Sequence, residues 1–309
     1  MATYYSNGKL MLTGEYLVLK GAVSLAMPVK FGQSLEIHEV PGNCNLIFET
    51  EVNGKPWFSA EYNPQTYEIF ETTNIQTATF VQRLLYFAQS LNSDFLNNER
   101  ETKVVTHINF DIDWGLGSSS SLISNIALWA NVDPFLLNNS VSKGSGYDIA
   151  CARSQSAILY QIGNGIPKFE KIILPEVFNQ NVYFIYLGRK QSTEQSIQSF
   201  EMLKNPTDKE VYEISDITHG FLSVNSAEEL IRLSELHEYL ISEIIGSQPI
   251  KEKLFSDFQG SVKSLGAWGG DFCMAVTAED SNYVKQYFGQ KGYQIIFSYN
   301  DIAIPTTIN

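Results

Sequence analysis

The sequence predicts an α+β fold with two domains, and three observations support this prediction. The chain has 309 residues, whereas one domain commonly holds about 150. Strand-like and helix-like apolar patterns are mixed along it without strict alternation, which favours α+β over α/β. Hydrophobic residues at 44% and charged residues at 18% are typical of a folded protein. We expect an N-terminal domain over residues 1–175 and a C-terminal domain over residues 176–309.

The charge balance and the cysteines narrow the classes of function. Twenty-one Lys and Arg face 34 Asp and Glu, and the net charge of −13 argues against general binding of nucleic acid or an anionic membrane. Three cysteines without paired spacing do not suggest a disulfide framework or a zinc cluster. The N-terminus lacks the pattern of a signal peptide, and no apolar run approaches the roughly 18 residues of a membrane span. We therefore expect a cytoplasmic protein.

The first half of the chain reads as strands followed by helices. Two strand-like runs lie between residues 9 and 28, with a break at Gly14-Glu15, and further strands are expected at 31–40 and 44–50. Apolar residues at three- and four-residue steps predict a helix over 77–91. Period-two alternation then predicts a strand over 104–113, and helical spacing returns from Leu122 to Ala130.

The second half mixes the two patterns. After a short apolar segment that ends near Tyr160, we expect a loop at 163–167, a strand before Pro175 and a buried strand at 181–187. Helices are predicted over 191–203, 216–245, 251–264 and around 282–289. Strands are predicted over 272–276 and 294–299.

A glycine- and serine-rich stretch joins the strand at 104–113 to the helix that follows it. It consists of Gly115, Leu116, Gly117, Ser118, Ser119, Ser120 and Ser121. A helix N-terminus after a glycine turn gathers unpaired N–H groups and favours an anion such as phosphate. It is not a Walker loop, because no lysine lies between Asp113 and Ser142, and it lacks the third glycine of a dinucleotide fingerprint. The alternative is an ordinary helix with a serine-rich cap.

Three further features could complete a phosphate site. Lys9 stands in a strand-like run, and alone it would read as an exposed surface lysine. Asp148 follows Gly144-Ser145-Gly146-Tyr147, where it is either a turn or cap residue or a general base. The cluster Gly266-Ala267-Trp268-Gly269-Gly270 is either a tight turn or a place where the backbone approaches a ligand closely. The four histidines lack metal-site spacing, and no Gly-x-Ser-x-Gly stretch suggests a serine hydrolase.

Taken together, these stretches resemble the GHMP kinases. Gly8 to Gly21, with Gly8-Lys9 and Gly14-Glu15-Tyr16, is similar to the first family motif, Gly115 to Ser121 to the second, and Gly266 to Gly270 to the third. The resemblance spans nearly the full chain. It implies an N-terminal domain similar to ribosomal protein S5 domain 2 and a C-terminal ferredoxin-like domain.

The resemblance also implies ligands and residue roles. ATP would bind with its phosphates on Gly115 to Ser121, with Mg²⁺ near Ser119. Asp148 would be the catalytic aspartate and Lys9 the lysine beside it. Residues expected near the substrate cleft are Glu15, Gly146, Tyr147, Gly266, Ala267, Gly269 and Gly270.

Some residues depart from the family pattern. Asn7 replaces a proline in the first motif, and Trp268 and Asp271 stand where the family often has glycine. The interval 131–147 contains Asp133 and no glutamate, although mevalonate kinases usually carry a Mg²⁺-binding glutamate before the catalytic aspartate. ATP and water would then supply most of the ligands of the metal.

Within the superfamily, the sequence looks most like the mevalonate-pathway branch. Gly14-Glu15-Tyr16 and Gly144 to Asp148 suit this branch, and Gly21 to Pro28 resembles mevalonate kinase. We expect phosphorylation of the 5-hydroxyl of mevalonate. Phosphomevalonate kinase is nearly as good an interpretation and would need extra cations, for which Lys143, Arg153, Arg189 and Lys190 are candidates. A related decarboxylase and a catalytically silent nucleotide- or metabolite-binding relative also stay open, as does a homodimer.

Overall fold

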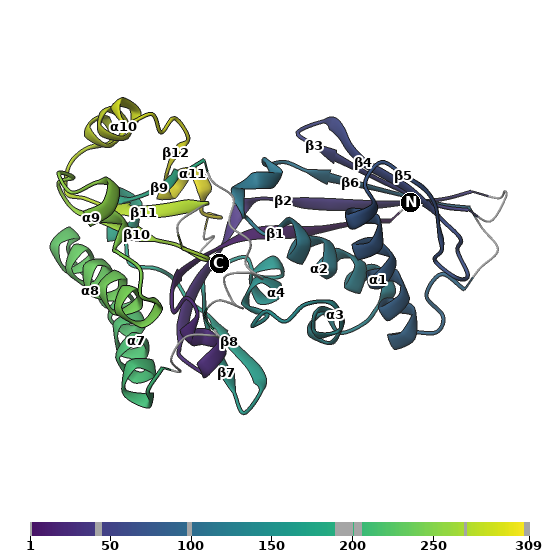
Figure 1. The fold of residues 1–309 in the computed structure, drawn as a ribbon, viewed down its shortest axis with the longest axis horizontal. Helices are drawn as coiled ribbons and strands as arrows, with labels where there is room; N and C mark the ends of the chain where they lie inside the picture. Colours follow the sequence, from purple (N-terminus) through teal and green to yellow (C-terminus); the bar gives the residue numbers. More distant parts are fainter. Residues whose placement is uncertain are drawn as a thin grey trace. The chain divides into compact units, whose positions relative to one another are not determined.

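The computed structural model describes residues 2–40, 45–97, 101–188, 200, 206–268 and 271–305. These ranges form the predicted α+β fold, and the chain divides into two compact units (Figure 1). The first unit contains Met1–Gly8, Phe31–Ile112 and Leu116–Arg153, and the second contains Lys9–Lys30, Asp113–Gly115 and Ser154–Asn309. The units thus draw on interleaved stretches of chain, while the domain boundary after residue 175 stays a prediction.

The first unit is built on one sheet. Residues 33–40 of β2 (Ser24–Val40) pair antiparallel with β6 (Glu101–Ile108), and β6 runs parallel to β3 (Leu46–Val52). Beyond β3 lie β4 (Lys55–Tyr62) and β5 (Ile69–Thr72), both antiparallel to their neighbours. Strand β1 (Ala2–Thr13) pairs with β2. The alternating burial of β3 and β6 shows that one face of this sheet is turned to the core.

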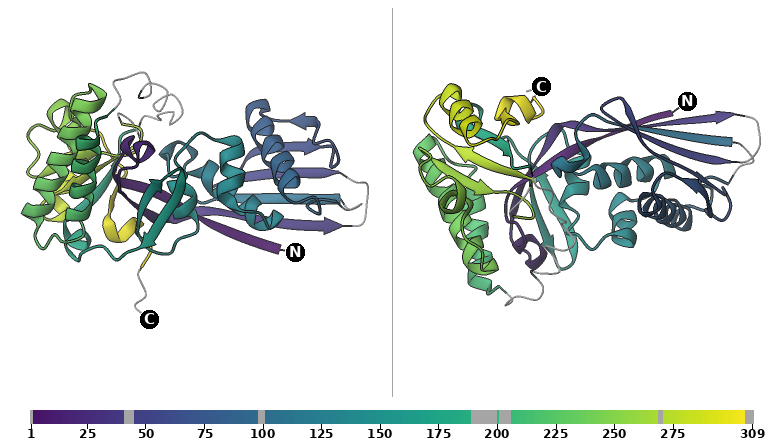
Figure 2. Two further views of the ribbon diagram at one scale, coloured as in Figure 1. Left: turned by 90° about the horizontal axis from the view of Figure 1, so that it is seen from below. Right: turned by 45° about the horizontal axis from the view of Figure 1, so that its top comes forward.

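Helices cover that face of the sheet (Figures 1 and 2). They are α1 (Ile75–Leu91), α2 (Ser118–Ala130), α3 (Pro134–Val141) and the short α4 (Tyr147–Ala152). Helix α1 begins where the Asn74 side chain accepts a hydrogen bond from the Thr77 N–H group. Its buried stripe packs with α2 against strands β3, β4 and β6 in one continuous hydrophobic core.

The second unit contains a four-stranded antiparallel sheet in the order β10-β11-β9-β12. These strands are β9 (Val182–Tyr186), β10 (Ser261–Ser264), β11 (Phe272–Val276) and β12 (Ile296–Ser298). One face of the sheet, with Tyr183, Ile185 and Ala275, packs against Val284 and Phe288 of α10 (Ser281–Gln290). The hairpin of β7 (Ile158–Gly163) and β8 (Ile166–Lys171) pairs with residues 24–26 of β2 and belongs to the same sheet as that strand.

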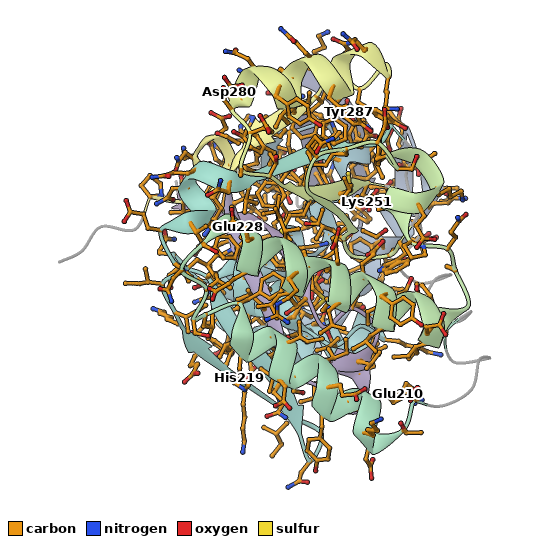
Figure 3. All side chains as sticks on the ribbon, turned by 90° about the vertical axis from the view of Figure 1, so that its left-hand side faces the viewer. Glu210, His219, Glu228, Lys251, Asp280 and Tyr287 are labelled. Carbon is orange, nitrogen blue, oxygen red and sulfur yellow. The ribbon has the colours of Figure 1, made fainter. Side chains whose placement is uncertain are left out.

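The remaining elements of the second unit are mainly helical. They are the 3₁₀ helices η1 (Leu17–Lys20) and η2 (Ile112–Trp114) and the helices α5 (Val177–Asn181), α7 (Asp208–Gly220), α8 (Ala227–Ile245), α9 (Ile250–Leu254) and α11 (Tyr299–Ile302). Figure 3 shows α7 and α8 side by side, with Glu210 and His219 toward opposite ends of α7. None of the helices in the described ranges has the length and apolar character that a membrane crossing requires.

Several sequence predictions of single elements are wrong. The predicted helix over 251–264 is instead the short α9 followed by β10, because Ser261–Ser264 are buried and pair with β11. The strand expected after Gly14-Glu15 begins as η1, since Gly14 and Tyr16 have φ values of 86° and 61° that turn the chain. The strand at 104–113 ends at Ile108, and the helix over 216–245 is two helices with a new cap at Ser226.

Other elements were not anticipated or cannot be compared. Strands β4 and β5 and helix α3 have no counterpart among the predictions. The turn at 41–43 and, apart from Phe200, the helix at 191–203 lie outside the described residues. The predictions for α1, α2, β9, β11 and α10 are confirmed to within a few residues.

Candidate active site

The glycine- and serine-rich stretch forms the predicted turn into a helix. Gly117 is the N-cap of α2 in a left-handed conformation with a φ of 93°, and no side chain in the described residues caps the helix. The N–H of Ser121 donates the first helical hydrogen bond, 3.0 Å, to the carbonyl of Gly117. Because the N–H groups of Ser118 to Ser120 precede that bond, they lie at the open N-terminus of α2. This geometry suits an anion.

The serine side chains in this stretch do not share one role. Ser119 is exposed and Ser118 is half-buried. The buried Ser120 hydroxyl donates to Gly117 O at 2.9 Å, and the buried Ser121 hydroxyl donates to Gln33 Oε1 at 2.8 Å. These two hydroxyls therefore hold the loop in shape. Phosphate binding by the stretch that contains Ser120 and Ser121 stays a prediction. Leu116 is fully buried and anchors the turn.

Asp148 lies in the first turn of α4, in the first unit. Gly146 precedes it as N-cap with a φ of 84°, a conformation that disfavours other residues. Asp148 and Tyr147 are half-buried, and the fully buried Ile149 fixes the helix in the core. Helix α4 packs against α2, so the structure brings the helix with Asp148 to the helix with the serine-rich N-terminus. Asp148 is thus placed on a rigid element.

Lys9 and Gly115 are brought together in the second unit. The half-buried Lys9 amino group donates a hydrogen bond of 3.0 Å to the carbonyl oxygen of Gly115. Gly115 has a φ of 66°, and the carboxylate of Asp271 lies so close that a Cβ atom on Gly115 would be 2.2 Å from Asp271 Oδ2. The first and second motifs therefore meet, across 106 positions of sequence. The contact between Asp271 and Gly115 was not predicted.

Glu15 lies in the interior of the second unit. Its side chain is fully buried and accepts a hydrogen bond from the equally buried Lys263. The place near the substrate cleft that the resemblance implies for Glu15 stays a prediction. Lys263 was not predicted as a partner, because it stands in the stretch 251–264 that was predicted to be helical.

The third glycine-rich turn is described only in part. Gly266 has a φ of 59°, Trp268 has a φ of 45°, and the Trp268 side chain is buried. Gly266 and Ala267 are half-buried, while Gly269 and Gly270 lie outside the described residues, as do Arg189 and Lys190. The positive φ of Trp268 is unusual for a bulky residue and marks a strained turn.

The described part of the protein offers few side-chain ligands for Mg²⁺. The described residues contain no group of three or more His, Cys, Asp or Glu side chains that could hold a metal ion. The exposed hydroxyl of Ser119 is the predicted ligand and is accessible at the start of α2. These residues fit a metal that takes most of its oxygen ligands from nucleotide phosphates and water.

The fold, together with the contact between the first and second motifs, indicates the class of protein. Solved structures of GHMP kinases match nearly the whole chain, so the fold is that of this superfamily and the two-domain α+β prediction is confirmed. A mevalonate kinase from Methanococcus jannaschii has a TM-score of 0.69 and 18% identity, with 99% of this chain and 98% of that chain covered. Streptococcus pneumoniae phosphomevalonate kinase, in complex with phosphomevalonate and AMPPNP, has a TM-score of 0.72 and 15% identity, with 96% and 99% covered.

A curated sequence relative points to the same superfamily. A phosphomevalonate kinase from Saccharolobus solfataricus is 26% identical over an alignment of 332 positions, which covers 94% of each protein. No protein-family model matches the chain. The predicted resemblance to GHMP kinases of the mevalonate-pathway branch is confirmed by these matches.

Proposed function

We propose that this protein is an ATP- and Mg²⁺-dependent kinase that phosphorylates a small acid of the mevalonate pathway. The observation that carries this proposal is the hydrogen bond from Lys9 to Gly115 O, because it joins the lysine of the first motif to a phosphate loop that has no lysine of its own. The Lys9 ammonium group brings to that loop the positive charge that favours a bound phosphate.

Each group of residues has its own role in the proposed phosphoryl transfer. The N–H groups at the start of α2 would bind the phosphates of ATP, and Lys9 would stabilise charge that develops during transfer. Asp148 would orient the acceptor hydroxyl and take its proton, a contribution of roughly 10²–10⁴ in rate. Mg²⁺, when bound near Ser119, would neutralise phosphate charge. Glu15, Ser120 and Ser121 have supporting roles.

The acceptor is phosphomevalonate or mevalonate. The sequence relative favours phosphomevalonate, since a phosphomevalonate kinase matches nearly the whole chain. The exposed cations Lys143 and Arg153 flank Asp148 in sequence and could pair with a substrate phosphate. The resemblance of Gly21 to Pro28 to mevalonate kinase supports mevalonate, which we retain as the second candidate.

One assay separates the candidates. The protein is incubated with ATP and Mg²⁺ and with either mevalonate or phosphomevalonate, and ADP, carbon dioxide and the phosphorylated acid are measured. We expect ADP and phosphorylated acid in equal amounts without carbon dioxide. Carbon dioxide would indicate the decarboxylase, and an absence of turnover with both acids would contradict the proposal and favour a silent binding protein.

A further inference from the structure

Four ionisable side chains are buried together in the second unit, away from the surface. Glu15, His237 and Lys263 have no exposed side-chain area, and Glu238 is 3% exposed. They come from three elements: the turn after β1, helix α8 and strand β10. The phosphoryl-transfer roles above use none of them directly. Buried charges are costly, so the arrangement needs an explanation.

Lys263 is the centre of this cluster. Its amino group donates to Glu15 Oε1 and, at 2.8 Å, to the carbonyl oxygen of Ser264. Glu238 faces the same lysine and accepts hydrogen bonds from the N–H groups of Ile250 at 3.0 Å and Ser264 at 2.9 Å. Glu15 thus contacts the cation directly, while Glu238 is held by backbone N–H groups and feels the charge of Lys263.

His237 completes the cluster as a neutral ring. Its Nε2 atom accepts a hydrogen bond of 2.9 Å from the Gly14 N–H, so the proton of the neutral ring is assigned to Nδ1. The same Nε2 atom lies 3.4 Å from Glu15 Oε2. Within the part of the chain that the structure describes, Glu15 Oε2 and His237 Nδ1 have no hydrogen-bond partner.

The cluster ties two motif segments to each other. Gly14 and Glu15 directly follow β1, the strand that carries Lys9. Lys263 and Ser264 end β10, and the chain continues through Leu265 into the turn at Gly266. The contact between Glu15 and Lys263 therefore sets where the end of β1 lies with respect to the start of the third motif. A neutral apolar pair could pack there, but it would not specify this register by hydrogen bonds.

Stability alone does not account for the pair. Replacing a buried ion pair by apolar residues of similar size is often neutral or stabilising, because the desolvation of both charges is avoided. A network that leaves two buried polar atoms unpartnered is still less favourable for stability. Such a network is understandable where a fixed geometry is needed.

We propose that Glu15 and Lys263 are positioning residues that hold the Lys9 strand and the third glycine-rich turn in the arrangement required for phosphoryl transfer. This inference rests on the proposed kinase function. The pair does not touch the reacting groups. It acts through Lys9 on one side and through the Gly266 turn on the other, with His237 fixing Gly14 and Glu238 fixing Ser264.

The test uses variants with and without the pair. In the double variant Glu15→Gln/Lys263→Met, both charges of the pair are removed, and Glu238 keeps its hydrogen bonds from the N–H groups of Ile250 and Ser264. The matched control is Glu235→Gln/Lys251→Met, which removes an exposed pair of 2.8 Å between α8 and α9 (Lys251 is labelled in Figure 3). We expect the double variant to melt near the wild-type temperature and to keep the KM for ATP, while kcat falls about 10- to 100-fold. The control should keep wild-type kcat.

A second measurement follows the pH dependence of the rate. Burial raises the pKa of Glu15 to about 7, so protonation below that pH should weaken the pair. Lys263, His237 and Glu238 face this carboxylate and shape its titration. The single-turnover rate of the wild type should therefore fall as pH drops through about 7, and this inflection should be absent from Glu15→Gln. A folded double variant with wild-type kcat, or a flat wild-type rate across this range, would overturn the proposal.

The positioning role can be tested even if the kinase proposal is wrong. If the wild type transfers no phosphate, the kinase proposal is wrong, and the geometric part is judged by acrylamide quenching of the buried Trp268 against a Trp268→Phe reference. Greater Trp268 quenching in the double variant, with none in the control, supports the link from Lys263 to the third turn. Unchanged quenching contradicts it.

Discussion

Gly115 is the residue at which the first and second motifs meet, and the structure explains why it has no side chain. It combines a positive φ of 66° with a carboxylate from Asp271 against its Cα atom. We predict that Gly115→Ala lowers stability by more than the roughly 1–2 kcal/mol of a left-handed residue and weakens ATP binding about tenfold or more. Calorimetric titration with ATP and thermal unfolding measure both effects.

Gly246 provides the matched control for that substitution. It has the same φ of 66° at the end of α8, but an added Cβ would meet no atom within 4 Å. Gly246→Ala should therefore show the backbone cost alone and leave ATP binding unchanged. Equal losses of ATP affinity in both variants would show that the contact between Asp271 and Gly115 has no role in the loop.

The buried His237 should make the stability of the protein depend on pH. Burial lowers the pKa of His237 well below its ordinary value of 6.5, so below that pH only the unfolded chain takes up this proton. The wild type should lose stability from this residue as pH falls, by up to about 1.4 kcal/mol per pH unit. In His237→Gln, which keeps an acceptor for Gly14, that loss disappears.

The measurement is a comparison of unfolding free energies between pH 5 and pH 8. The raised pKa of Glu15, about 7 against 4.5, acts in the opposite direction, because stability from Glu15 is complete below 4.5 and is lost as pH rises through 7. The two effects partly cancel in the wild type. The stability gap between wild type and His237→Gln should narrow as pH falls, and a constant gap would contradict a neutral buried ring.

We predict that Lys143 or Arg153 selects the acceptor acid by pairing with its phosphate. If phosphomevalonate is the substrate, one of these exposed cations should pair with its phosphate, and its replacement by Met should raise the KM for phosphomevalonate about tenfold or more. The KM for ATP should hardly change. Lys55→Met, at an exposed position on β4, is the control for a lost positive charge. Equal KM values in all three variants would argue against this role.

At the scale of elements, α7 begins with a complete capping box. The Thr207 hydroxyl accepts from the Glu210 N–H, and the Glu210 carboxylate accepts from the Thr207 N–H. We predict that Thr207→Ala costs roughly 0.5–2 kcal/mol and that Thr207→Ser restores most of it. Urea unfolding measures the change, and an alanine variant as stable as the wild type would show that the box contributes nothing.

The elements also show what local patterns can predict. Helices α1 and α2 were predicted because their apolar stripes repeat at helical spacing, which depends only on neighbouring residues. Strand β10 was missed because Ser261–Ser264 is short and polar in part, and its strand character comes from pairing with β11. The 3₁₀ helix η1 was missed because a short apolar run such as Leu17-Val18-Leu19 fits several structures.

At the scale of the whole molecule, the motifs could be predicted from the sequence, but the side-chain contacts that hold them in place could not. Gly115 to Ser121 and Asp148 stand in short stretches whose composition indicates a glycine turn before a helix. The partners Glu15 and Lys263 are separated by 248 positions, and their pairing depends on how β10 joins its sheet. The inward direction of the Ser120 and Ser121 hydroxyls likewise depends on helix phase and on Gln33.

The central claim is that the three motifs serve phosphoryl transfer with Asp148 as the base. Its most direct test is the single-turnover transfer of the γ-phosphate of ATP to phosphomevalonate and to mevalonate, in the wild type and in Asp148→Asn. We predict transfer to one acid by the wild type, and a rate roughly 10²–10⁴ lower in a folded, ATP-binding Asp148→Asn protein. Transfer at the wild-type rate by that variant, or no transfer by the wild type, would contradict it.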